Sequence, residues 1–110
     1  MTHADDRIDR FQALVDEDDA NELAQFSLAQ ALLDAGRSAD ALAHFQRTYE
    51  LEPEHMMAYY RAAECLMQLG RLADARPLLE TTIRLAVAQN HVGPRADAQD
   101  LLEEIEDSLG

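Results

Sequence analysis

The chain repeats itself at a fixed interval. The stretch DAGRSADA, which contains Gly36, returns as QLGRLADA, which contains Gly70, so the repeat interval is 70 − 36 = 34. Repeats of roughly 20–50 residues are typical of arrays of stacked units, and about 34 residues make one helix–turn–helix unit. Other identical residues superimpose at the same interval: Ala29 on Ala63, Leu32 on Leu66, Arg37 on Arg71, Ala39 on Ala73, Asp40 on Asp74, Ala41 on Ala75, Thr48 on Thr82 and Leu51 on Leu85.

The first half of the unit is predicted to be a helix over residues 21–35. Its apolar residues recur at about helical spacing and cover most of the helix circumference, as expected for a helix packed on two sides. Asp19, followed at the third position by Glu22, resembles a capping box at its start. Gly36 stands where a left-handed residue would end the helix.

The second half of the unit is predicted to be another helix. Ser38 can cap its start, and it should stop near Glu52 because Pro53 disfavours α geometry in the residue before it. The next unit repeats this arrangement, with helices expected over residues 54–69 and 72–90.

These residues resemble the tetratricopeptide repeat family. The family pattern has small residues where paired helices touch, a large apolar residue in the second helix, an aromatic early in the first helix and a final proline. The residues that match are Ala29, Ala41, Phe45 and Pro53 in one repeat, and Ala63, Ala75, Leu79 and Tyr59 in the other. Gln25 replaces the aromatic residue and Val87 replaces the proline. The resemblance implies an all-α, right-handed α-α superhelix of five or six helices.

The array is expected to extend at both ends. Phe11 precedes Phe45 by one repeat interval, which predicts the second helix of a preceding half-repeat. At the other end Pro94 suits a first helical turn and opens an amphipathic segment that can cover the end of the array. The single domain 1–110 is therefore divided into a half-repeat helix at 1–18, repeat one at 21–54, repeat two at 55–90 and a capping helix at 94–109.

The composition is strongly acidic. The 22 acidic residues outnumber nine arginines, there is no lysine, and the formal net charge is −13. Such a surface disfavours nucleic acid and anionic membranes. The bias reflects either a GC-rich genome with a soluble surface or a cytoplasm of high ionic strength, where salt screens the repulsion. There is no long apolar run and no secretory signal pattern, so we expect a cytoplasmic protein.

The sequence shows no catalytic or metal-binding motif. The four histidines are scattered, no pair has the spacing of a zinc site, and no glycine-rich phosphate loop occurs. Cys65 cannot form an internal disulfide and has no histidine near it, so we interpret it as a small helix–helix contact. We therefore predict no enzyme activity, no metal and no cofactor.

The resemblance implies protein binding along a groove lined by the first helix of each repeat. Family members that clamp a peptide carboxylate use Lys and Asn here, but this chain has Phe26, Gln30 and Glu64, with Arg61 as the one basic residue. No such clamp is expected. Each repeat contributes five residues that share one helix face, and the candidate groove residues are Leu23, Phe26, Ser27, Gln30, Leu33, Met57, Tyr60, Arg61, Glu64 and Met67.

An apolar groove in an acidic protein suits a protein or peptide partner with apolar anchors and some basic residues. Three alternatives stay open at this point. Phe26, Leu33 and Met67 can instead belong to the core. An apolar face can pair with its own copy to form a homodimer. The domain can also act as an accessory beside a separate enzyme.

Overall fold

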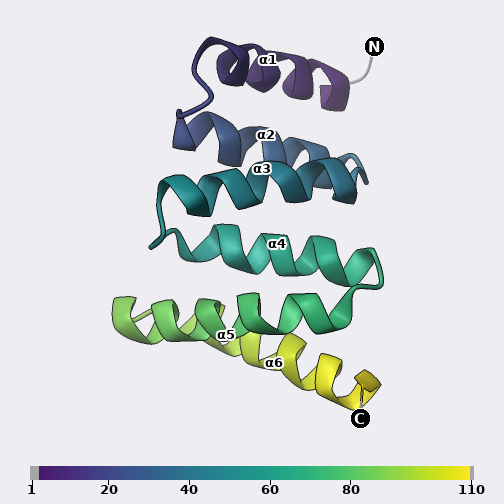
Figure 1. Cartoon of the computed structure of the whole chain (residues 1–110), viewed down its shortest axis with the longest axis vertical. Coiled ribbons are helices and arrows are strands. Elements are labelled where there is room, and N and C mark those ends of the chain that lie inside the picture. Colours follow the sequence, from purple (N-terminus) through teal and green to yellow (C-terminus); the bar gives the residue numbers. More distant parts are fainter. Residues whose placement is uncertain (1–2, 110) are drawn as a thin grey trace.

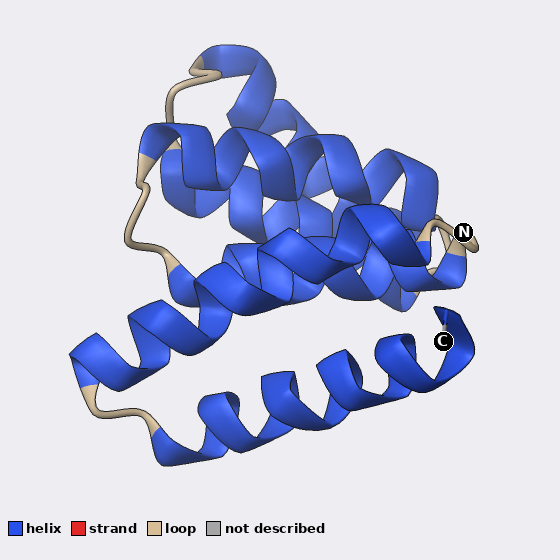
Figure 2. Cartoon of the chain, turned by 60° about the horizontal axis from the view of Figure 1, so that its bottom comes forward, coloured by secondary structure: helices blue, strands red, loops and turns tan. Residues whose placement is uncertain are grey.

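The computed structural model describes residues 3–109, and all its regular elements are α-helices. They stack in chain order, so that the two ends of the chain lie at opposite ends of the stack (Figure 1). Each helix packs against the next one along the chain, and only short loops join them (Figure 2). The helices are α1 (His3–Glu17), α2 (Glu22–Asp34), α3 (Ser38–Leu51), α4 (Met56–Gln68), α5 (Leu72–Gln89) and α6 (Val92–Leu109).

The two repeated glycines end α2 and α4 in the same way. Gly36 and Gly70 have φ angles of 77° and 76°, in the left-handed region that glycine adopts without strain. After each glycine, the backbone N–H of Arg37 or Arg71 donates to the carbonyl of Leu32 or Leu66, at 2.9 and 2.8 Å. This bond satisfies a carbonyl at the helix end, and the prediction for Gly36 is confirmed.

The prediction of a capping box at Asp19 is wrong. The N-cap of α2 is Asn21, whose Oδ1 accepts a hydrogen bond from the backbone N–H of Ala24 at 3.1 Å. Asp19 instead forms an ion pair with Arg47 of α3 at 2.7 Å. An Asn side chain satisfies a free N–H of the first turn as well as Asp does, and here it lies immediately before the helix.

The prediction that Ser38 caps α3 is also wrong. The N-cap is Arg37, which makes no capping bond with its side chain, and Ser38 is buried and donates its hydroxyl to Oε1 of Gln68. Arg37 pairs with Asp40 in the first turn at 2.8 Å. A carboxylate in the first turn stabilises a helix through its dipole, so Asp40 takes over part of the role expected of Ser38.

Three helix boundaries differ slightly from the expected ones. Helix α4 begins at Met56 because His55 is its N-cap, with Nδ1 accepting from the N–H of Ala58 at 3.2 Å. Helix α5 continues through Pro77 and ends before Asn90, which is left-handed with φ 60°. Helix α6 begins at Val92, so that Pro94 lies in its first turn.

Equivalent residues of the two repeats fill the core. The side chains of Phe45 and Leu79 are fully buried, as are Thr48 and Thr82. Each threonine hydroxyl donates to a backbone carbonyl of the preceding helical turn, at 2.8 Å in both repeats. A buried polar group needs such a partner, so the repeats share this satisfied hydroxyl as well as their apolar contacts.

Candidate functional site

Helices α2 and α4 have the same pattern of burial. We number the residues of each helix from its first residue and call these numbers places. Places 3, 7, 8, 10 and 11 are buried in both helices, whereas places 2, 5, 6, 9 and 12 keep exposed surface in both. The partly exposed places hold the ten residues predicted to line the groove, which we call the first-helix face: Leu23, Phe26, Ser27, Gln30, Leu33, Met57, Tyr60, Arg61, Glu64 and Met67.

The residues of the first-helix face are neither core nor free surface. Nine of the ten are half-buried, and Leu23 is 74% exposed. Phe26, Leu33, Tyr60 and Met67 pack against the core with one side and keep the other side open. The side chains are therefore held in place by the protein but remain accessible.

Phe26 connects the first repeat to the second. Its ring lies 5.6 Å from Phe45 in an edge-on arrangement and 4.5 Å from the ring of His55. His55 caps α4, and its Nε2 is 3.6 Å from a carboxylate oxygen of Glu22. His55 is absent from the residues that the sequence predicts for the groove. His55 stands one repeat interval after Asn21, the residue that caps α2. The repeat register could therefore have identified His55 as the cap of α4.

The charged part of the site surrounds Tyr60. Arg61 forms an ion pair with Glu64 at 2.6 Å and lies over the Tyr60 ring, 5.7 Å from its centre. Burial raises the pKa of Tyr60, and the carboxylates of Glu64, Asp97 and Asp100 raise it further, against the opposing effect of Arg61. Three carboxylates thus act on one half-buried aromatic ring.

Helix α6 partly repeats the burial pattern of α2 and α4. Its place 7, Ala98, is buried and its places 3, 10 and 11 are half-buried, whereas its place 8, Gln99, is exposed. Asp97 and Asp100 are places 6 and 9, the places that Arg61 and Glu64 take in α4. From the sequence this helix is expected only to be a cap. The sequence does not show this equivalence, because α6 is out of register with the repeat. Helix α4 starts at Met56, and α6 starts at Val92, which is two residues later than one repeat interval after Met56.

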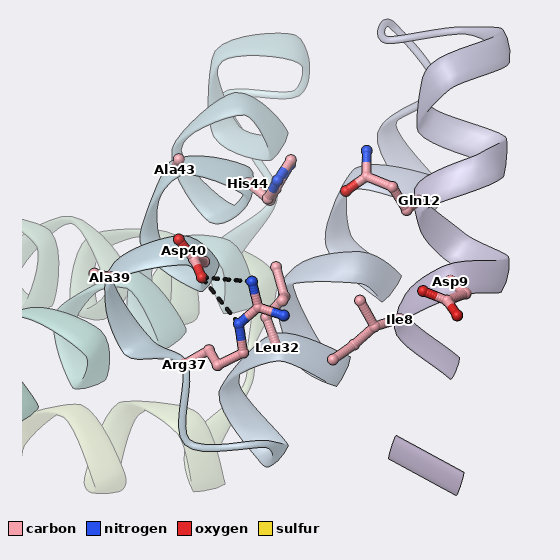
Figure 3. Close-up of a pocket in the computed structure, with 9 residues that line it drawn as sticks. All are labelled: Ile8, Asp9, Gln12, Leu32, Arg37, Ala39, Asp40, Ala43 and His44. Carbon is pink, nitrogen blue, oxygen red and sulfur yellow. Dashed lines mark hydrogen bonds and ion pairs between the residues drawn. The ribbon is translucent and has the colours of Figure 1, made fainter. Parts of the chain in front are cut away.

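A cavity of about 400 Å³ opens elsewhere, between α1 and α3 (Figure 3). The two basic side chains in its wall are engaged within the protein. Arg37 pairs with Asp40 at 2.8 Å, and Nδ1 of His44 bonds to Oε1 of Gln25 at 2.8 Å. We therefore assign no ligand to this cavity.

Cys65 is fully buried, in agreement with its interpretation as a helix–helix contact. Burial, with a smaller effect of Glu64, raises the pKa of its thiol to about 11, so the thiol stays protonated.

Within residues 3–109, no three His, Cys, Asp or Glu side chains meet in a way that could hold a metal ion. None of the helices described is both long and apolar enough to cross a membrane.

Comparison with protein families agrees with this geometry. The sequence model of the tetratricopeptide repeat matches residues 8–51 and 26–90. The chain belongs to the tetratricopeptide repeat family. No curated protein sequence matches it significantly.

Solved structures with the same fold cover nearly the whole chain. PcrH, known from Pseudomonas aeruginosa, is similar in its complex with the chaperone binding region of PopD (TM-score 0.92, 27% identity, 97% of this chain and 81% of that one). The Yersinia enterocolitica type III secretion chaperone SycD, with a peptide of the translocator YopD, has a TM-score of 0.90 at 23% identity, over 97% and 82% of the two chains. The first repeat domain of Spaghetti, bound to an HSP90 peptide, has 0.84 at 23%, over 96% and 80%. This fold is that of protein-interaction modules.

Proposed function

We propose that this tetratricopeptide repeat protein binds a segment of another protein along the first-helix face. The observation that carries the proposal is the burial pattern that α2 and α4 share, which leaves the same five places of each helix partly exposed. The complexes of PcrH, SycD and Spaghetti with peptides support it, because each of these similar folds holds a peptide of a partner protein.

The side chains of the face suit apolar anchors. Leu23, Phe26 and Met57 offer apolar surface near the junction of α2 and α4. Thioethers adapt their shape to varied partners, and partly buried aromatic rings are common sites of strong binding. Because the surrounding charge is negative, the partner segment should combine apolar anchors with basic residues.

Selection from a random library of short peptides, followed by anisotropy measurements with the best binders, tests the proposal. The variants Leu23→Asp and Tyr60→Asp place a charge on the face and should weaken binding about tenfold or more. Val87→Asp is the matched control, because Val87 is a 52% exposed apolar residue of α5, outside the face.

The proposal fails if the two face variants bind the selected peptides as tightly as the unchanged protein. It also fails if Val87→Asp weakens binding to the same extent, because the effect would then reflect added charge alone. Circular dichroism of all three variants checks that their helix content is equal.

Self-association is the second candidate, and α1 supplies the observation that favours it. Phe11 and Leu14 are the equivalents of Phe45 and Thr48, one repeat interval earlier. The latter two are fully buried, whereas Phe11 is half-buried and Leu14 is 40% exposed. Among the described residues, no helix precedes α1 to cover this face. Light scattering on the same samples decides: a mass that doubles with concentration favours a homodimer.

A further inference from the structure

We propose that the bound segment has an ordered chemistry, with apolar anchors against α2 and α4 and a Lys or Arg against the junction of α4 and α6. This inference rests on the proposed function and specifies what the face selects. It assigns Asp97 and Asp100, together with Tyr60 and Glu64, as the subsite for the basic side chain.

The end of the face on α2 carries no charge. Its five residues are Leu23, Phe26, Ser27, Gln30 and Leu33, and three of the five are large apolar residues. Phe26 is held by ring contacts with Phe45 and His55. A fixed, partly open ring offers a partner an apolar contact with little loss of side-chain entropy.

Helix α6, beyond the first-helix face, has the opposite character. Helix α6 carries six carboxylates and one arginine, and among residues 3–109 neither Asp97 nor Asp100 forms an ion pair. Asp97 and Asp100 take places 6 and 9 of α6, the places that Arg61 and Glu64 take in α4, and together with Glu64 they raise the pKa of Tyr60. From the first-helix face of α2 to the equivalent places of α6, the side chains therefore change from uncharged to acidic.

The cation that lies over the Tyr60 ring is already paired. The guanidinium of Arg61 is 2.6 Å from Glu64 and 5.7 Å from the centre of the Tyr60 ring. Arg61 therefore leaves Asp97 and Asp100 without an ion pair among residues 3–109. The stacked position of Arg61 also shows that the Tyr60 ring accommodates a cation on its face, an arrangement that aromatic rings favour.

A partner that covers this end must compensate these charges. Removing a carboxylate from water without a partner costs free energy, and a basic side chain that pairs with it removes the penalty. A neutral or acidic segment would therefore be disfavoured over α6, and charge complementarity selects the basic one.

The stack also limits the spacing. Helix α5 packs against both α4 and α6, whereas α4 and α6 do not pack extensively against each other. Packed helices lie about 8–10 Å apart, so two such steps place α6 at most about 16–20 Å from α4. An extended chain covers that distance with about six residues, so we expect the basic residue within about six residues of the apolar anchor.

The test uses the tightest peptide from the library selection and two variants of it. In one variant the basic residue is changed to Ala, and in the other that residue is moved to the other side of the anchors.

Two double variants of the protein are compared. One combines Asp97→Asn with Asp100→Asn, and the control combines Glu80→Gln with Glu106→Gln. The control removes two charges outside the face, since Glu80 is exposed on α5 and Glu106 lies two and a half turns, at about 3.6 residues per turn, beyond Asp97 on the opposite side of α6.

The double Asn variant should bind the original peptide about tenfold more weakly and bind the Ala peptide as the unchanged protein does. The control should bind both peptides normally, and the peptide with the moved basic residue should bind about tenfold more weakly to the unchanged protein. Equal loss in the control, no loss in the Asn variant, or selected peptides without a basic residue would overturn the ordered subsite while leaving peptide binding intact. If no library peptide binds at all, the proposed function fails first, and this inference fails with it.

Discussion

The two repeats of this protein agree inside and differ outside. The residues that hold each helix pair together are the same or similar: a left-handed glycine, an Arg–Asp pair after it, a buried threonine and a large apolar side chain. The partly exposed residues of the first-helix face have changed, from Phe26, Ser27 and Gln30 to Tyr60, Arg61 and Glu64. Packing therefore constrains the shared positions, and the face between them is free to acquire its own chemistry.

At place 4 of the first helix the two repeats carry different polar residues, and each repeat satisfies its polar group in its own way. Gln25 is 2% exposed, and its amide donates to the carbonyl of Asp19 at 2.8 Å while its oxygen bonds to His44. The equivalent residue, Tyr59, stacks on Tyr49 with ring centres 4.3 Å apart and donates its hydroxyl to a backbone carbonyl at 2.9 Å. A hydrogen-bonded amide thus replaces an aromatic stack at the same place.

The largest effect on this comparison should come from removing the buried side chain of each second helix. Phe45→Ala should lower the free energy of unfolding by about 3–5 kcal/mol and Leu79→Ala by about 2–5 kcal/mol, because each leaves a cavity in a close-packed core. Urea unfolding followed by circular dichroism measures both. A loss below about 1 kcal/mol in either variant would show that its repeat does not share the common core.

The shared interior is the part that the sequence predicts well. Periodic apolar residues and repeated glycines specify helices and their ends, and both signals recur at a fixed interval. The choice of cap is less predictable, because Asp18, Asp19 and Asn21 all stand before α2 and any of them can accept a hydrogen bond from the first turn. The geometry of the loop selects Asn21.

The partial equivalence of α6 with α2 and α4 is not predictable from the sequence, for a different reason. The repeat interval aligns α2 with α4 but not α4 with α6, since α5 runs to Gln89 in the absence of a proline at position 87. The two additional residues move Asp97 and Asp100 out of register with the repeat. Contacts between helices distant in sequence, such as Phe26 with His55, likewise depend on how neighbouring units pack and carry no local signal.

A smaller effect should come from the two glycines, and it should be equal in both repeats. A Cβ added at Gly36 or Gly70 meets no other atom within 4 Å, so alanine costs only the left-handed backbone, about 1–2 kcal/mol at each site. Asparagine tolerates this conformation better, as Asn90 does in this chain. Thermal unfolding should therefore rank glycine above asparagine above alanine at both positions. A cost confined to one repeat would break the equivalence of the two turns.

The smallest expected effect is on the pH dependence of stability, and it involves a residue of repeat one only. Burial lowers the pKa of His44 from its ordinary value of 6.5, against an opposing effect of Asp40, and repeat two has Leu78 at the equivalent position. A lowered pKa means that the unfolded chain takes up the proton first, so the contribution of His44 to stability is complete above about pH 6.5 and falls as the pH falls below it. His44→Gln, which can still donate to Gln25, should reduce the slope of unfolding free energy between about pH 5 and pH 7. An unchanged slope would show that the histidine of repeat one does not contribute to the pH dependence, and that the two repeats are equivalent in this respect as well.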